Sequence, residues 1–238
     1  MIKLLKTLTI SFVLLSFTVI SSKAYVFDVW TVEGMVNPSE FAEATSNFKE
    51  KAMAGGAKYD NIRASIKIRG DRSNDTGFVI ATYNNYEDMM ETSALVAQNP
   101  DWFASTYGSI EVQGTMITSA TYGNDVPLND NTGGIGNTVG YNILEIEDGV
   151  NFVLNFPKLK KLMSELGAPA AFDFAFCATC GSEVRPGEAV VWAASANMID
   201  AGKTMDIFAS EQVQTWLYRN MRPFVNIVDS GVHMYLTD

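Results

Sequence analysis

This chain of 238 residues carries one pattern twice, and that repeat limits the folds it can adopt. Residues 25–123 and 140–238 each predict the same order of elements: strand, helix, strand, strand, helix, strand. The copies share hydrophobic periodicity and turn signals rather than identical residues, which is typical of a diverged duplication. Residues 124–139 are rich in Asn, Asp and Gly without a hydrophobic period, so they predict a linker between the copies.

Helix signals recur at matching places in the two copies. Asn37 and Pro38 predict a helix start in the first copy, because Asn caps free backbone N–H groups and Pro suits the first turn. In the second copy we expect Pro157 to begin the corresponding helix. The second helix of each copy is predicted to break and restart, at residues 99–100 and at residues 210–211.

The strands complete a βαββαβ unit in each copy, with final strands predicted at residues 110–118 and 225–236. Such a ferredoxin-like unit covers one face of its antiparallel sheet with helices, so the other face needs a partner. We therefore predict an α+β protein in which two ferredoxin-like repeats pack their sheets together as a single-chain α/β barrel. Two independent ferredoxin-like domains are the alternative.

This element order resembles the dimeric α/β-barrel superfamily, here as a tandem version within one chain. The resemblance covers most of residues 25–238 and rests on the order of elements, without a shared sequence motif. The superfamily contains cofactor-free monooxygenases, haem enzymes such as chlorite dismutase, and members with no known activity. The resemblance therefore implies the fold, and a monomer in which the halves take the places of two subunits, but it allows several functions.

The first 24 residues are typical of a secretory signal peptide. Lys3 and Lys6 precede an apolar stretch at residues 8–20, and residues 22–24 fit a cleavage site with small flanking residues. The apolar stretch is short for a bilayer span of about 20 residues, so cleavage is favoured over a membrane anchor. We therefore expect a periplasmic or secreted protein that is not embedded in the membrane after cleavage.

The charge of the chain limits its partners. Its formal net charge is −10 at pH 7, which disfavours binding to nucleic acid or to an anionic membrane surface, since both require a basic face. Hydrophobic residues make up 47% of the chain, which is enough for a substantial core. A small-molecule ligand remains the partner that the composition allows.

Cys177 and Cys180 are the only cysteines, and they stand where a predicted strand runs into a turn. In an exported protein such a pair predicts a structural disulfide. A thiol-redox pair and copper ligation are the alternatives. A closed zinc site is disfavoured, because it needs four ligands and the chain adds only one histidine to the two cysteines.

Alternation in the first strand of each copy predicts a ligand site. Asp28 and Trp30 share one face, and aligning Gly34 with Gly149 places Glu145 on the same face. We expect this face to point into the space between the two sheets, where a cleft with an indole ring and charged groups would hold a ligand. A solvated sheet face is the alternative. The predicted ligand-binding residues are Asp28, Trp30, Arg63, Lys67, Glu145 and His233.

His233 is the only histidine, and it lies in the last predicted strand. A single histidine argues against Ser-His-Asp catalysis and against a multi-histidine metal site. No motif around it matches the histidine that ligates iron in the haem enzymes of the resembling superfamily. We therefore expect no metal site and no cofactor, with haem or copper as the less favoured alternatives.

These observations predict an exported small-molecule-binding or accessory protein, because no catalytic motif is present in the sequence. The first alternative is a cofactor-free or haem-dependent oxidoreductase of the monooxygenase-like type, which the resemblance implies. The second alternative is a periplasmic thiol-redox or metal-handling protein that uses Cys177 and Cys180.

Overall fold

The computed structural model describes residues 25–71, 75–114, 117–124, 134, 136–179 and 187–238. The strands are β1 Tyr25–Glu33, β2 Asn61–Gly70, β3 Thr76–Tyr83, β4 Ile117–Asn124, β5 Thr138–Ile146, β6 Ala171–Thr179, β7 Glu188–Ser195 and β8 Val225–Tyr235. The helices are α2 Pro38–Ala54, α3 Tyr86–Gln98, α4 Pro100–Tyr107, α5 Gly149–Glu165, α6 Met198–Phe208, α7 Glu211–Asn220 and the short 3₁₀ helix η2 Arg222–Phe224.

The strands form one closed barrel in the order β1-β3-β2-β8-β5-β7-β6-β4, and every pair is antiparallel. Two pairings join the halves of the chain: β2 with β8, where Ser65 lies opposite Tyr235, and β4 with β6, where Tyr122 lies opposite Cys177. The predicted barrel is therefore confirmed. Its halves meet edge to edge in one continuous sheet.

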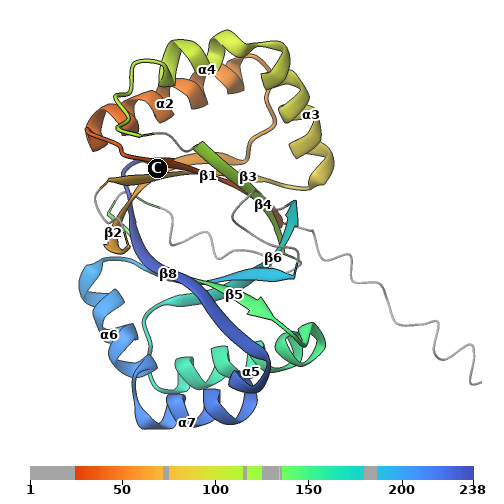
Figure 1. Cartoon of the computed structure of the whole chain (residues 1–238), viewed down its shortest axis with the longest axis vertical. Helices are drawn as coiled ribbons and strands as arrows, with labels where there is room; N and C mark the ends of the chain where they lie inside the picture. The colour runs from red at the N-terminus through yellow and green to blue at the C-terminus, as the bar shows by residue number, and fades with distance from the viewer. Residues whose placement is uncertain (1–24, 72–74, 115–116, 125–133, 135, 180–186) are drawn as a thin grey trace, which may run out of the picture.

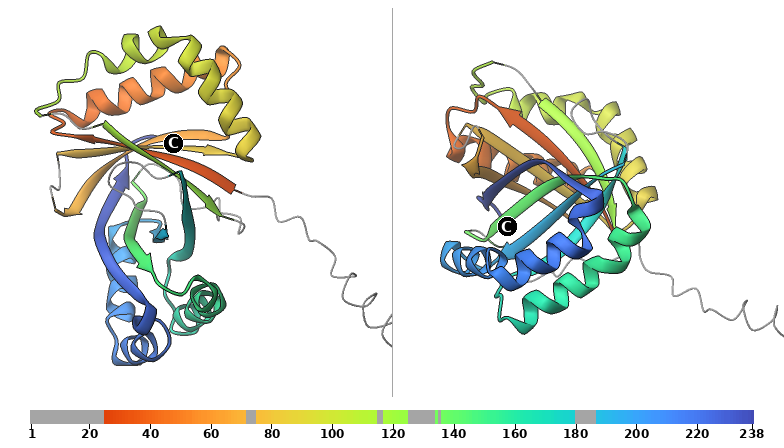
Figure 2. Two further views of the ribbon diagram at one scale, coloured as in Figure 1. Left: turned by 45° about the vertical axis from the view of Figure 1, so that its right-hand side comes forward. Right: turned by 60° about the horizontal axis from the view of Figure 1, so that its bottom comes forward.

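The helices cover the outside of the barrel (Figures 1 and 2): α2, α3 and α4 lie over the strands of the first half, and α5, α6 and α7 over those of the second. In the first half Phe41 and Phe48 of α2 pack on Val79 of β3 and its neighbours. In the second half Phe152 and Phe156 of α5 pack in a cluster with β5 and β6. Each half thus has its own core between helices and sheet.

A further apolar layer fills the barrel interior. Phe27 of β1 stacks on Tyr122 of β4 and meets the edge of Trp192 of β7 at a ring-centroid distance of 5.5 Å. Strands β1 and β7 are not neighbours in the barrel, so the contact with Trp192 crosses the interior. Alternation along each strand therefore sends one set of side chains toward the helices and the other set into the barrel.

The helix starts follow their caps. The side chain of Asn37 accepts hydrogen bonds from two backbone N–H groups at the start of α2, as predicted. The breaks between α3 and α4 and between α6 and α7 also fall where the sequence placed them. The prediction for Pro157 is wrong: Asp148 caps α5 at its side-chain oxygen, the helix begins at Gly149, and Pro157 lies inside it.

The last strand of the first half also differs from the prediction. Strand β4 begins at Ile117 rather than residue 110, because the chain at Val112 makes only an isolated bridge to Met35 and then turns at Gly114, where φ is +77°. A left-handed φ of this kind favours glycine and interrupts a strand. Strand β4 ends at Asn124 and β5 begins at Thr138, so most of the predicted linker lies outside the described residues.

The predicted signal segment, residues 1–24, also lies outside the described residues, so export stays a prediction. Among the helices that the structure does describe, none is both long enough and apolar enough to cross a membrane.

Candidate functional site

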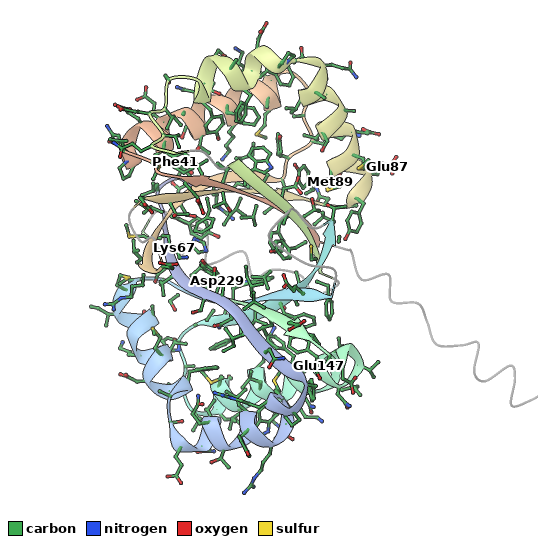
Figure 3. The ribbon with its side chains drawn as sticks, in the orientation of Figure 1. Phe41, Lys67, Glu87, Met89, Glu147 and Asp229 are labelled. Atoms are coloured by element: carbon green, nitrogen blue, oxygen red, sulfur yellow. The ribbon has the colours of Figure 1, made fainter. Side chains whose placement is uncertain are left out.

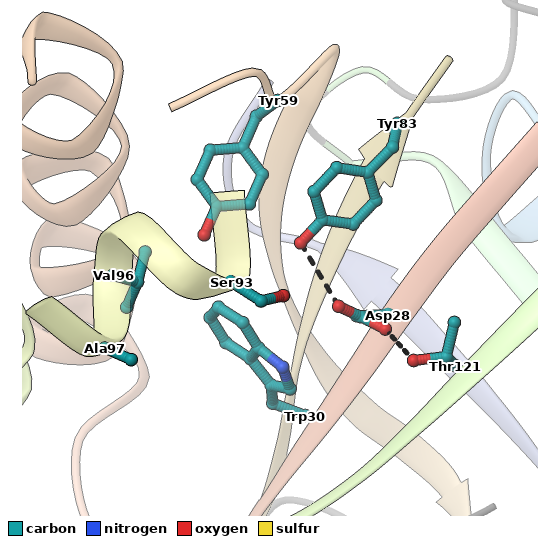
Figure 4. A pocket seen from close by; sticks show the side chains of 8 residues that line it. All are labelled: Asp28, Trp30, Tyr59, Tyr83, Ser93, Val96, Ala97 and Thr121. Carbon is teal, nitrogen blue, oxygen red and sulfur yellow. Dashed lines mark hydrogen bonds between the residues drawn. The ribbon is translucent and has the colours of Figure 1, made fainter. Parts of the chain in front are cut away.

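A cavity of about 380 Å³ opens between the first-half sheet and α3 (Figure 4). Strands β1, β3 and β4 contribute one wall, helix α3 contributes another, and the loop before β2 closes the side. Its lining residues are Asp28, Trp30, Tyr59, Tyr83, Ser93, Val96, Ala97 and Thr121.

Asp28 is the buried carboxylate of this cavity. Alternation along β1 turns it toward the helices, with Thr121 of β4 directly opposite. Thr121 Oγ1 donates a hydrogen bond to Asp28 Oδ1, and Tyr83 Oη donates one to Asp28 Oδ2 at 3.1 Å. Each carboxylate oxygen can accept more than one hydrogen bond, so both retain capacity for a ligand.

Burial dominates the electrostatics of this carboxyl. The side chain of Asp28 is almost entirely shielded from solvent, and desolvation raises its pKa above the usual value although the two hydrogen bonds oppose the shift. Burial also raises the pKa of Tyr83, and the nearby Tyr59 and Asp28 raise it further. The tyrosines therefore stay neutral hydrogen-bond donors, and Asp28 is the group in this cavity that takes up and releases a proton most readily.

Trp30 supplies the aromatic wall. It lies two residues beyond Asp28 on the same face of β1, and its ring meets the edge of Phe48 on α2 at a centroid distance of 5.9 Å. Val96 and Ala97 of α3 face the same space. A flat apolar molecule with one acidic O–H or C–H group fits this combination of an indole face, aliphatic walls and a buried base.

The sequence analysis brought Asp28 and Trp30 together correctly but placed them on the wrong side of the sheet. Both face the helices, and the barrel interior receives Phe27 and Val29 instead. The expectation followed the more apolar face to the helices. In a closed barrel both faces of the sheet are covered, so apolarity does not distinguish them.

Glu145 does not join them. It lies at the exposed end of β5, opposite Glu188 of β7, on the face that carries Tyr141 into the barrel. The strand register pairs Val26 with Tyr83 in the first half and Thr138 with Ser195 in the second, and both second residues stand two positions before a helix cap. The alignment of Gly34 with Gly149 was therefore wrong by three residues, and an odd shift exchanges the faces of a strand.

The other predicted site residues lie inside the barrel. Arg63 and Lys67 of β2 point into it, and Lys67 lies opposite His233 of β8. The ring of His233 packs against Phe78, Tyr141 and Tyr235. The structure thus separates the six predicted residues into a cavity pair, an interior group of three, and Glu145 at a strand end.

Of the cysteine pair, Cys177 lies in β6 against the interior cluster of Phe27 and Tyr122, and Cys180 lies outside the described residues. The disulfide, the redox role and copper binding therefore stay predictions.

Four polar residues of the cavity were missed by the sequence analysis: Tyr59, Tyr83, Ser93 and Thr121. Tyr83 could have been found, since it ends a strand of known face two residues before the Asn85 cap. Thr121 was hidden because the last strand was placed too early in the sequence.

The second half does not repeat this cavity's polar groups. By the strand registers, Gly140, Val232 and Ser195 occupy the positions of Asp28, Thr121 and Tyr83. The carboxylate and both of its hydrogen-bond donors are therefore specific to the first half.

Comparison with known proteins gives the fold. No protein-family model matches the sequence, and no curated protein matches it significantly. Similar solved structures include candidate monooxygenases from Fusobacterium nucleatum subsp. nucleatum ATCC 25586 (TM-score 0.57, 10% identity, covering 90% of this chain and 93% of that one) and Lactobacillus acidophilus NCFM (0.50, 12%, 90% and 96%). An anthrone oxidase-like protein is similar at a TM-score of 0.52 and 9% identity, covering 91% of this chain and 94% of that one.

The expectation of no cofactor is corrected. Structures similar at a lower TM-score include a haem-binding protein from Thermus thermophilus (0.43, 12% identity, 90% of this chain and 91% of that one), so proteins of this kind do carry cofactors. The described residues nevertheless do not fit a haem. The ring of His233 is enclosed by Phe78, Tyr141 and Tyr235 at centroid distances of 5.4 to 6.1 Å, which leaves no position beside its nitrogens for a porphyrin plane.

Eight antiparallel strands closed into one barrel, helices on the outside only, and similarity along nine-tenths of the chain to these structures together show that the fold resembles that of the dimeric α/β-barrel superfamily.

Proposed function

We propose that this protein is a small-molecule oxidoreductase of the monooxygenase-like type, with the Asp28 cavity as its active site. One observation carries the proposal: a buried carboxylate, held by Tyr83 and Thr121, faces a cavity that Trp30 lines. A perturbed carboxyl in a cleft is typical of a catalytic group. Two similar structures are candidate monooxygenases, and at 10% to 12% identity they support the fold on which such a site can be built.

The proposed chemistry begins with a proton transfer. A substrate with a phenolic or enolic O–H lies against Trp30, and Asp28 accepts its proton, so the substrate becomes an electron-rich anion. Tyr83 and Thr121 keep the carboxylate in place and donate to it throughout. The anion loses electrons more readily than the neutral molecule, which is the contribution of this chain's own residues to an oxidation.

The test is Asp28→Asn, which keeps the shape of the side chain but cannot take up a proton. With a panel of phenols and naphthols as substrates and an oxygen electrode as readout, we expect kcat to fall about 100-fold or more with a smaller change in KM. Asp60→Asn is the matched control, because Asp60 is exposed one residue beyond Tyr59 and outside the cavity lining.

Binding is measured separately by quenching of tryptophan fluorescence with 1-naphthol, using Trp30→Phe to identify the signal of the cavity. If naphthol binds but no phenol is oxidised, the oxidoreductase proposal fails and the cavity belongs to a binding protein. If Asp28→Asn turns over substrate as fast as the wild type, Asp28 is not the base.

The proposal includes two features of the whole chain. The halves have the same relative strand order, β4-β1-β3-β2 and β8-β5-β7-β6, which supports an origin by duplication of one ferredoxin-like unit. Export to the periplasm or beyond is retained on the basis of the signal-like residues 1–24 alone.

A further inference from the structure

A second group of unusual residues lies inside the barrel, where β2, β5 and β8 meet. Arg63 and Lys67 lie on the interior face of β2, and His233 lies on the adjacent strand β8 directly opposite Lys67. All three groups can carry positive charge. Figure 3 shows Lys67 and Asp229 on this side of the barrel.

The positive charge here exceeds its negative partners. Lys67 is 6% exposed, and its Nζ lies 3.9 Å from Asp229 Oδ2, an oxygen that also accepts a hydrogen bond from Tyr141 Oη at 3.3 Å. Arg63 has no acidic partner within the described part of the chain, and its Nε is buried without a hydrogen-bond acceptor there. An enclosed guanidinium without a counter-charge is costly, so an anion at this point would stabilise it.

His233 supplies the second unpartnered group. Its side chain is 6% exposed, and Nδ1 is buried with no hydrogen-bond partner in the described residues. Arg63 and His233 flank the same ring: Arg63 Cζ lies 5.7 Å from the centroid of Tyr235, and the His233 ring lies 5.4 Å from it. Two unsatisfied nitrogen atoms from adjacent strands thus lie on either side of one tyrosine.

We propose that this interior group of Arg63, His233 and Tyr235 is a binding site for a small carboxylate, separate from the Asp28 cavity. The planar fork of arginine matches a carboxylate with two parallel hydrogen bonds. Phe78 and Tyr141 pack against His233 and give the site an aromatic wall, so it favours a carboxylate attached to a ring.

The two sites differ in charge and in the face of the sheet that carries them. The Asp28 cavity lies on the helix-facing side and holds a carboxylate of its own, which repels an anion. The interior site lies on the opposite face and holds the cations. A phenol and a carboxylate are therefore directed to different sides of the same sheet.

The single histidine of the chain makes the test direct, because it gives one imidazole signal. Protein labelled with ¹⁵N-histidine is titrated with sodium benzoate and with sodium acetate, against sodium chloride at equal ionic strength. We expect a saturable shift of the His233 resonances with both carboxylates and tighter binding of benzoate. In Arg63→Gln the affinity for benzoate should fall at least ten-fold.

Arg69→Gln is the matched control, since Arg69 lies on the same strand but is exposed, and it should bind benzoate as the wild type does. Near-UV circular dichroism checks that Arg63→Gln is folded. If it is not, Arg63→Lys replaces it, because lysine keeps the charge but lacks the fork, and a several-fold loss of affinity is expected.

The proposal is overturned if the wild type shows no saturable shift, or if Arg63→Gln and Arg69→Gln bind alike. It is also overturned if inorganic phosphate binds more tightly than benzoate, or if Asp28→Asn alters benzoate binding more than Arg63→Gln does. None of these results depends on the phenol oxidation assay, so this proposal and the proposed function can fail separately.

Discussion

At the scale of single residues, the chain buries two titratable groups whose charged forms are disfavoured. Asp28 and His233 lie on opposite faces of the barrel wall, and burial raises the pKa of the first and lowers that of the second to about 4. Neither burial helps the fold at every pH, because each charged form loses hydration. A buried group that costs stability is expected where function requires it.

Replacing Asp28 should stabilise the protein at alkaline pH. The folded-state pKa of Asp28 lies above its unfolded value, so its favourable contribution is present at low pH and is lost as pH rises through the folded pKa. Asp28→Asn should therefore have a larger free energy of unfolding than the wild type at pH 8, with a difference that shrinks toward pH 4. Urea unfolding at both pH values measures this, with exposed Asp60→Asn as control. A variant that is less stable than wild type at pH 8 would contradict the prediction.

His233 predicts the opposite slope. Its folded-state pKa is about 4, below the unfolded value of 6.5, so the unfolded chain takes up the proton first as pH falls below about 6.5. Between pH 7 and pH 4.5 this group should remove roughly 2–3 kcal/mol from the free energy of unfolding. His233→Phe keeps a ring among Phe78, Tyr141 and Tyr235 and should lose that much less on acidification. Equal acid sensitivity of variant and wild type would show that His233 is accessible to protons in the folded state.

At the scale of elements, helix α5 carries a local conflict. Pro157 lies inside the helix, where it cannot donate a backbone hydrogen bond to Val153, whereas Pro38 lies at the start of α2, where no such bond is made. The cap at Asp148 and the buried Phe152, Phe156 and Met163 hold α5 across this break.

Pro157→Ala should therefore raise the free energy of unfolding by about 1–3 kcal/mol, because it restores a helix hydrogen bond and removes a steric conflict. Pro38→Ala is the matched control and should leave stability unchanged or slightly lower, since proline at the first position restricts the unfolded chain at no cost to the helix. Thermal and urea unfolding measure both. The prediction fails if the two substitutions have the same sign and size.

Elements also show what the sequence could and could not predict. Helix caps such as Asn37 and the strand alternation around Ile62 are local signals, and they gave the element order and the barrel. Face assignment depended on relating Asp28 to Glu145 across 117 residues, and a three-residue error in that relation exchanged the faces. The cavity was beyond local signals, because Tyr59, Ser93 and Thr121 come from three elements that meet only in the closed fold.

At the scale of the whole molecule, closure couples the halves. Pairing of β2 with β8 and of β4 with β6 leaves no free strand edge in the described sheet, and Phe27 reaches across the interior to Trp192. Edge-to-edge association between chains is thereby disfavoured, which agrees with the predicted monomer. The two outer cores and the shared interior should unfold together, so we expect one cooperative transition for the full chain.

A fragment of residues 25–124 should accordingly not form a stable monomer. Alone, it would expose the backbone edges of β2 and β4 together with the interior faces of Phe27 and Tyr122, which β8, β6 and Trp192 cover in the full chain. We expect light scattering to show dimers or larger species, because a second copy can cover the same edges and faces. Co-expression with residues 134–238 should instead give a one-to-one complex whose near-UV circular dichroism matches that of the full chain. A monomeric 25–124 fragment with its own cooperative unfolding transition would mean that each half folds independently, and that the interior contacts serve ligand binding more than stability.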